Sequence, residues 1–369
     1  MASVQVQAMF LRDTRHGGAP GQAAQVADAL ARFVAGATAT IDVAIYDFRL
    51  TGSGLAATVV DALTAAAARG VAVRIAYDAG KPAAADATSF AKLAADPAPP
   101  GTAQWVTDHF AGTAVQTRPI TAPGDQLMHC KYVIRDGAKR YHTAAVWTGS
   151  TNFTDDAWTV QENNIVTLTS QKVARAYLAD FDELWAAGTI TGTGAGNGGS
   201  GRVGHATVGW DFAPGGGPAM DAALAAAVDA ATNRVVLASM VITSHALLTS
   251  LVAALGRGVP VSGIYDRGQM DPIEAEWAQH PSSAETLAHW RTVKPNLAAK
   301  RSAPYTPTSI HDFMHNKIMI TDSALTTGSY NLSGNAEHNA ENQLRITHDP
   351  TLLDQYLDYV TAITRAYAT

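Results

Sequence analysis

The sequence predicts an α/β fold made of two related halves. Short apolar runs typical of buried strands alternate with alanine-rich helical stretches, and the same landmarks recur at a nearly constant distance along the chain. These pairs and their offsets are Arg69 and Arg257 (188 residues), Asp78 and Asp266 (188), His129 and His315 (186), and Asn152 and Asn331 (179). Four matching offsets indicate an internal duplication.

Each half shows the same order of expected elements. In the first half we expect helices over residues 22–35 and 54–68, and strands over residues 41–46 and 71–77. Their counterparts in the second half are helices over 219–231 and 245–255, and strands over 235–242 and 259–265. We therefore expect the halves to span residues 5–187 and 206–369, joined by a linker over residues 188–205.

The predicted linker contains a run of glycines at residues 191–201, which cannot pack a core and indicates a flexible connection. A nucleotide-cradling loop is the functional alternative. It is disfavoured because neither a Lys-Ser/Thr pair nor a G-x-G-x-x-G turn accompanies the glycines.

Composition narrows the class of protein. With 369 residues, 47% of them hydrophobic, the chain can bury a large core, and a charged fraction of 16% excludes a disordered protein or a coiled coil. The net charge of -6 gives no general attraction to nucleic acid or anionic membrane, although a local basic site is compatible with it. Cys130 is the single cysteine, so an intrachain disulfide is excluded.

The sequence leaves localisation open. No apolar run approaches the roughly 20 residues that span a bilayer, and the first residues lack the basic and apolar stretches of a signal peptide. A cytoplasmic protein and an exported protein whose signal is not part of this sequence are both compatible. We expect a monomer without an obligate protein partner.

Each half carries an H-x-K-x4-D motif, then G-S-x-N, then a glutamate ten residues beyond the asparagine. The first copy comprises His129, Lys131, Asp136, Ser150, Asn152 and Glu162, and the second comprises His315, Lys317, Asp322, Ser329, Asn331 and Glu341. Residues two apart on a strand share a face, so each histidine projects beside its lysine. The Gly-Ser turn and the asparagine amide add donors that can face an anion.

Two such half-sites facing each other would place one histidine on each side of a phosphorus atom. One imidazole can then attack phosphorus while the other protonates the departing oxygen. Lys131 and Lys317 would neutralise the equatorial oxygens, so neither a metal nor another cofactor is expected. Glu162 and Glu341 are the candidates to hold the second nitrogen of the histidine rings.

The paired motifs resemble the two HKD motifs of the phospholipase D superfamily, which includes phospholipases, phospholipid synthases, bacterial endonucleases and tyrosyl-DNA phosphodiesterases. The resemblance covers nearly the whole chain. It implies a duplicated phospholipase D-like fold, with mixed sheets flanked by helices and an active site at the pseudo-twofold interface. It also implies that His129 is the nucleophile, forming a phosphohistidine intermediate, and that His315 is the general acid/base. Asp136 and Asp322 would stabilise the fold.

Two other interpretations of the motif residues are weaker. Ser150 and Ser329 could be hydrolase nucleophiles, but no G-x-S-x-G elbow surrounds them, so phosphate-binding turn residues are favoured. His311 and His315, four residues apart, could ligate a metal. The turn-rich sequence before them argues against a helix, and no carboxylate cluster lies nearby in the sequence.

The motifs identify the bond and leave the substrate open. The slightly acidic chain favours a phospholipid or small phosphodiester, with transient contact at a membrane surface and an apolar rim from residues 108–116 and 304–307. A metal-independent endonuclease acting on DNA or RNA is the alternative, and the missing signal peptide favours it. A non-catalytic phosphate-binding protein is disfavoured because both motifs are complete. Hydrolysis and transfer to another alcohol are both compatible.

The first motif is followed by a longer hairpin than the second. Thirteen steps separate Asp136 from Gly149, whereas six separate Asp322 from Gly328. The additional residues include Lys139, Arg140 and His142, and we expect this hairpin to shape access to the site.

Overall fold

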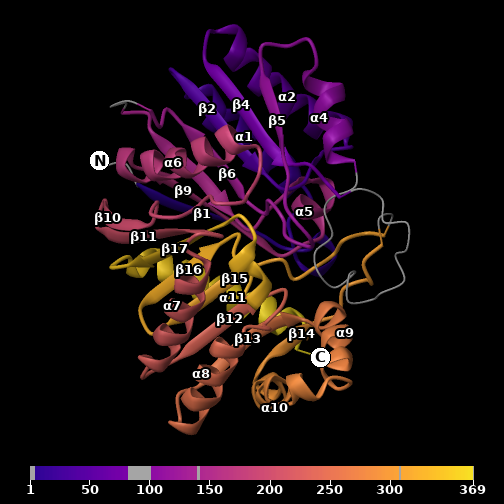
Figure 1. The fold of residues 1–369 in the computed structure, drawn as a ribbon, viewed down its shortest axis with the longest axis vertical. Coiled ribbons are helices and arrows are strands. Elements are labelled where there is room, and N and C mark those ends of the chain that lie inside the picture. Colours follow the sequence, from indigo (N-terminus) through magenta and orange to yellow (C-terminus); the bar gives the residue numbers. More distant parts are fainter. Residues whose placement is uncertain (1–4, 82–100, 139–141, 307–308, 369) are drawn as a thin grey trace.

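The computed structural model describes residues 5–81, 101–138, 142–306 and 309–368. Two large mixed sheets form its framework, one from each half, with helices around them (Figure 1). The strand order is β1-β9-β7-β6-β2-β4-β5 in the first sheet and β10-β11-β17-β16-β15-β12-β13-β14 in the second. The predicted duplicated α/β fold is confirmed.

The two sheets repeat one pattern. In each, a parallel pair (β2 with β4, β12 with β13) is followed outward by antiparallel strands, and most motif residues lie at the ends of these strands. The strands of the first sheet are β1 (Val6–Leu11), β2 (Thr40–Ile45), β4 (Ala72–Asp78), β5 (Gln116–Ile120), β6 (Lys131–Arg135), β7 (Ala145–Gly149) and β9 (Asn163–Thr169). Those of the second are β10 (Gly199–Val203), β11 (Ala206–Ala213), β12 (Val235–Ser239), β13 (Val261–Asp266), β14 (Ala298–Lys300), β15 (Lys317–Thr321), β16 (Ala324–Gly328) and β17 (Glu341–Thr347). A small third sheet joins β3 (Phe48–Arg49) to β8 (Phe153–Thr154).

The four predicted helices form within two residues of their expected ends. The helices of the first half are α1 (Gln22–Ala35), α2 (Ser53–Ala68), α4 (Thr102–Phe110), α5 (Asp155–Thr159) and α6 (Gln171–Ala187). The second half has α7 (Gly217–Asp229), α8 (His245–Gly256), α9 (Arg267–Trp277), α10 (Ala284–Val293) and α11 (Pro350–Ala366). Short 3-10 turns lie at η1 (Thr14–His16), η2 (Pro281–Ser283), η3 (Lys294–Asn296) and η4 (Gly334–His338). No described helix has the length and hydropathy of a membrane span.

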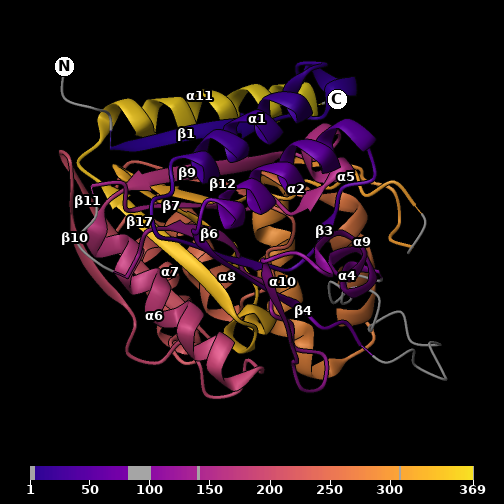
Figure 2. The same cartoon turned by 90° about the horizontal axis from the view of Figure 1, so that it is seen from above.

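The last helix of each half packs against the other half. Tyr177 of α6 meets Phe212 of β11 with its ring centroid at 4.9 Å, and Tyr356 of α11 meets Phe10 of β1 at 4.8 Å. Figure 2 shows α11 running alongside β1. One continuous apolar core therefore includes buried residues from both halves. The halves share this core and are not independent of each other in packing.

The glycine run predicted as a flexible linker is partly ordered, so that prediction is wrong. Gly199–Val203 forms β10 and pairs antiparallel with β11 at the edge of the second sheet. The indole of Trp210 lies where a side chain at Gly199 would stand, with its nearest atom 3.1 Å from that position. An aromatic ring over a glycine in a strand makes up for the missing side chain and stabilises the pairing. The low complexity of the run gives no sign of this contact in the sequence.

The motif aspartates hold the turns before the central strands. Asp136 accepts hydrogen bonds from the backbone N–H groups of Thr38, Ala39 and Thr40, with lengths between 2.7 and 3.1 Å. Asp322 does the same for residues 232–234, and both aspartates have a positive φ, 53° and 50°. Each carboxylate therefore ties the loop after the motif strand to the start of β2 or β12.

The hairpin after the first motif is described only in part. Lys139 and Arg140 lie outside the described residues, and His142 is exposed at its turn. The predicted role of this hairpin in shaping access stays a prediction.

We expect Asp136→Ala to lower the free energy of unfolding by about 1–3 kcal/mol, because three backbone donors lose a shared, buried acceptor. Asp136→Asn should cost less, since asparagine keeps one acceptor oxygen and tolerates positive φ. Burial opposes ionisation of Asp136, but its hydrogen bonds outweigh this and lower its pKa. The contribution is therefore complete above the unfolded pKa of about 4 and fades as pH falls below it. Urea unfolding measures it, and equal stability of the alanine variant and the parent would contradict it.

Candidate active site

The two motif histidines are held by the opposite half. The backbone N–H of His129 donates to the carbonyl of Ala340 at 2.9 Å, and that of His315 donates to the carbonyl of Glu162 at 3.0 Å. These bonds lie beside the isolated parallel bridges from Met128 to Ala340 and from Glu162 to Met314. The reciprocal arrangement brings both histidines to the pseudo-twofold interface, where both are buried.

The two motif lysines are buried beside the histidines. Lys131 and Lys317 are each 2% exposed, and each Nζ donates at 2.7 Å to the carbonyl of the histidine two residues before it. Lys131 Nζ also lies 4.9 Å from the ring centroid of Tyr46, whose ring is 4.8 Å from that of His129. Two ammonium groups in a buried site would stabilise an anion strongly.

The ring partners of the two histidines differ in charge. His129 Nδ1 is 2.8 Å from Oε1 of Glu341, and His315 Nδ1 is 3.1 Å from Oδ1 of Asn163. Both contacts cross between the halves. A hydrogen bond at Nδ1 sets the ring so that Nε2 is the nitrogen to meet a substrate. One histidine therefore has a carboxylate partner and the other a neutral amide.

Of the two glutamates that were candidates to hold the histidine rings, Glu341 holds His129, whereas His315 is held by Asn163, the residue after Glu162. Asn164 donates to Thr327 and Tyr356, and Asn342 makes the matching bonds to Thr148 and Tyr177. With Asn164 and Asn342 equivalent, the counterpart of Glu341 is Asn163, and that of Glu162 is Ala340. The loop between the G-S-x-N motif and the ring partner is one residue longer in the first half, and equal counting from the asparagines hid this difference.

Glu162 instead joins a network on the far side of the His315 backbone. Its carboxylate accepts hydrogen bonds from Lys300 Nζ and from the Tyr367 hydroxyl, both at 2.6 Å. Burial raises the pKa of Glu162, although the Lys300 ammonium opposes that shift. Its side chain therefore touches the site only indirectly, through the backbone bond to His315.

The motif asparagines retain unused hydrogen-bonding capacity. Asn152 and Asn331 are 7% and 6% exposed, and Oδ1 of each has no hydrogen-bond partner among the described residues. Asn152 lines a small pocket together with His315 and Tyr46. Buried polar atoms without partners are costly, so amides at this place are suited to meet a ligand.

The two motif serines are bonded within the protein. Ser150 Oγ donates to Oδ1 of Asn163 at 2.7 Å, and Ser329 Oγ accepts the backbone N–H of Asn342 at 2.9 Å. The role of these hydroxyls in binding an anion stays a prediction. Ser150 fixes the amide that faces His315.

Two aspartates that the sequence marked only as repeat landmarks support the histidine loops. Asp78 Oδ2 accepts the backbone N–H of Met128 at 2.8 Å, and Asp266 Oδ2 accepts that of Met314 at 2.7 Å. Burial raises the pKa of each to about 6, against opposing hydrogen bonds. Each carboxylate thus fixes the residue directly before a motif histidine. The repetition of these two aspartates at one offset was a signal that they matter, but the sequence did not indicate which residues they contact.

The electrostatics of the site disfavour charge on His315. Burial is the largest cause, and the positive charges of Lys317 and Lys131 add to it, so the pKa of His315 lies well below 6.5. A bound phosphate would offset both ammonium groups and ease protonation of this ring. Among the described residues no cluster of three His, Cys, Asp or Glu side chains could hold a metal. His311, which the sequence offered with His315 as a possible metal ligand, has its ring stacked on those of Tyr305 and Phe313.

Comparison with known proteins agrees with this architecture. A family model described as Cardiolipin synthase, PLD-like domain matches residues 30–185 and 224–363. A search of curated protein sequences found no match.

Two solved structures share the fold over nearly the whole chain at low sequence identity. Phosphatidylserine synthase from Haemophilus influenzae is 13% identical with a TM-score of 0.63, over 97% of this chain and 86% of that one. Polyphosphate kinase from Porphyromonas gingivalis is 12% identical with a TM-score of 0.56, over 96% of this chain and 49% of that one. Nuc from Salmonella typhimurium, a phospholipase D family member, is 21% identical over 42% of this chain and 92% of its own, with a TM-score of 0.32.

We expect the His315 ring to stay neutral at pH 6.5 and to become more basic in Lys317→Met, because one nearby positive charge is removed. Ring nitrogen shifts in an NMR titration measure both. Lys294→Met removes a lysine of the same half that is paired with Glu274 instead, and should leave His315 unchanged. Titration of His315 near 6.5 in the parent protein would contradict the expectation.

Proposed function

We propose that this chain, which belongs to the phospholipase D superfamily, cleaves a phosphodiester bond through a phosphohistidine and without a metal. One observation supports the proposal above the rest: two buried histidines, each held at Nδ1 by the opposite half, converge with two buried lysines. A site of this kind can bind a phosphodiester anion and supply both a nucleophile and an acid.

In the first step Nε2 of His129 attacks phosphorus. A P–N bond forms, the bond from phosphorus to the departing oxygen breaks, and His315 transfers its proton to that oxygen. The His129 ring becomes positively charged as the P–N bond forms, so the Glu341 carboxylate stabilises it. Asn163 carries no negative charge that would raise the pKa of His315, so the imidazolium releases its proton readily.

In the second step water attacks the phosphohistidine. His315, now neutral, accepts a proton from the water as the new P–O bond forms and the P–N bond breaks. The products are a phosphate monoester and regenerated His129. An alcohol in place of water gives transfer of the phosphoryl group to a new ester by the same proton movements. Lys131 and Lys317 neutralise the phosphoryl oxygens in both steps.

A phospholipid or another small phosphodiester is the substrate class that we favour. The pocket beside His315 is lined mostly by polar side chains but also by the rings of Tyr46, Tyr305 and Phe313, and the exposed Ile310 lies in the same segment. Apolar and aromatic groups around the site suit an acyl or alkyl ester, and the net charge of -6 gives little help in tracking a nucleic acid. Binding at a membrane surface would then be transient.

Hydrolysis of a bis-aryl phosphodiester should persist in EDTA and fall by at least about a thousandfold in His129→Ala, because the nucleophile is lost. His205→Ala, a change at an exposed histidine, should retain full rate. Circular dichroism of each variant checks folding. Dependence of the parent enzyme on an added divalent ion would contradict the metal-free mechanism.

Trapping the intermediate decides between the histidines. An aryl oxide leaves without protonation, so His315→Ala should still be phosphorylated and should then accumulate the phosphoenzyme. Rapid quenching at alkaline pH and peptide mass spectrometry should place phosphorus on His129. Phosphorus on His315 in the His129→Ala variant would reverse the two roles.

A parallel assay on phosphatidylcholine vesicles and on plasmid DNA at low salt tests the substrate class. We expect headgroup release without nicking, lost in His129→Ala. Nicking without headgroup release would instead establish the alternative, a metal-independent endonuclease, and would refute the phospholipid assignment.

A further inference from the structure

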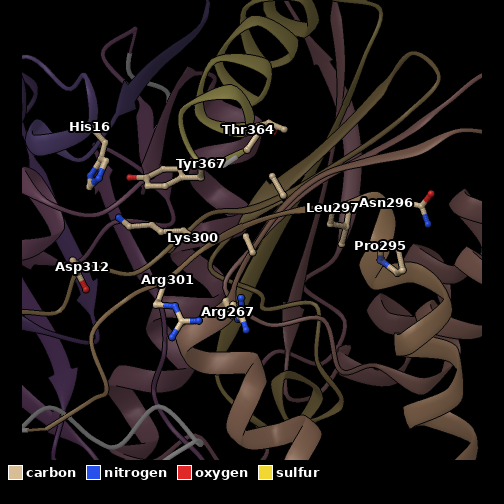
Figure 3. A pocket seen from close by; sticks show the side chains of 13 residues that line it. His16, Arg267, Pro295, Asn296, Leu297, Lys300, Arg301, Asp312, Thr364 and Tyr367 are labelled. Carbon is tan, nitrogen blue, oxygen red and sulfur yellow. The ribbon is translucent and has the colours of Figure 1, made fainter.

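A second cleft opens on the second half, apart from the histidine site. It encloses about 760 Å³ between the start of α9, the segment from η3 through β14, and the end of α11. Figure 3 shows Lys300, Arg301, Arg267 and His16 around it, with Tyr367 above Lys300. Neither motif histidine nor either motif lysine lines this cleft.

The lining of the cleft carries excess positive charge. Arg301 is exposed and makes no ion pair among the described residues, and Arg267 pairs only with the exposed Asp271 at 3.0 Å. The one lining carboxylate, Asp312, is already bonded to Arg15 at 2.7 Å. Lys300 is paired with Glu162, and Nδ1 of His16 lies 3.3 Å from Oδ2 of Asp13. Arg301 is therefore the lining cation without a matching acid among the described residues.

The pseudo-twofold symmetry shows that the fold does not require charge at this place. Lys300 pairs in register with Asp266, as Ile120 pairs with Asp78, so Lys300 stands where the first half has a buried isoleucine. Its partner Glu162 likewise stands where the second half has Ala340. The positions of the buried ion pair between Lys300 and Glu162 are therefore occupied by apolar residues in the symmetry-related copy. Buried ion pairs of this kind add little net stability, so stability alone does not explain why the charges occur in one half only.

The cleft and the histidine site share one wall. Asp312 lines the cleft, while its neighbours His311 and Phe313 line the pocket that contains His315. Lys300, on the cleft side, bonds Glu162, whose carbonyl receives the His315 N–H. The two cavities are therefore separate but adjacent.

We propose that this cleft is a second anion-binding site, which takes a phosphate group through Arg267, Arg301 and His16. Guanidinium groups present paired N–H donors that match phosphate oxygens, and donors from η1, α9 and the segment after β14 would surround a tetrahedral anion from several directions. The ligand is a phosphate ester, either a soluble one or the headgroup of an anionic lipid. The proposal concerns binding alone and does not depend on the proposed catalytic function.

Amide NMR titration with glycerol phosphate tests the site in the full chain. The parent protein should show two binding events, one with shifts near His315 and one with shifts near Arg301. Arg267→Ala/Arg301→Ala should weaken the second at least tenfold and leave the first, whereas Lys131→Met/Lys317→Met should do the opposite. Arg291→Ala removes an exposed arginine of the same half outside the cleft and should change neither. A single binding event, lost with the lysines and unaffected by the arginines, would overturn the proposal.

Vesicle flotation separates the two sources of phosphate. If the ligand is a lipid headgroup, phosphatidylglycerol vesicles should retain the parent protein, phosphatidylcholine vesicles should not, and the double arginine variant should lose retention. Binding of glycerol phosphate at the cleft without retention identifies a soluble ester. Retention of the double arginine variant equal to that of the parent would exclude the cleft as a lipid site.

Discussion

The reciprocal bonding between the halves is the constraint on which the rest of the structure depends. Each histidine loop takes a backbone hydrogen bond from the opposite half, and each histidine ring has its partner there. The same exchange occurs deeper in the core, where Asn164 bonds Tyr356 and Asn342 bonds Tyr177. A half alone would lack both the ring partner and the packing that buries its lysine, so the site and the shared core form together.

The twofold symmetry is broken at the ring partners of the two histidines. Glu341 faces one ring and Asn163 faces the other, on otherwise matching strands. A second departure lies just behind, where Glu162 and Lys300 replace apolar counterparts. Duplication supplies two equal sets of groups, whereas the proposed cleavage needs two different ones, a nucleophile and a general acid. Once both copies lie in one chain, each position can change in one half without changing in the other.

The strands, helices and motif residues could be predicted from the sequence because each depends on local pattern or on repetition. Alternation of apolar runs located β2, β4, α1 and α2 to within two residues, and the repeated spacing identified the histidines and lysines. The errors concern contacts between distant segments. One additional residue in the loop of the first half places Asn163 where equal spacing had put Glu162. The glycine-rich segment that resembled a linker by composition forms β10, which pairs with β11 and is contacted by Trp210.

The packing of α11 on β1 has a consequence for how the chain is made. Phe10, near the beginning of the sequence, is covered by Tyr356 and Tyr359, and the Tyr359 hydroxyl donates to the carbonyl of Leu11 at 2.8 Å. On a translating ribosome β1 emerges more than 300 residues before α11, the helix that covers it. During that interval the side chains of β1 that α11 covers stay exposed, a condition under which a nascent chain depends on chaperones. Because α11 is synthesised last, β1 of the first half cannot be fully buried until the second half is complete.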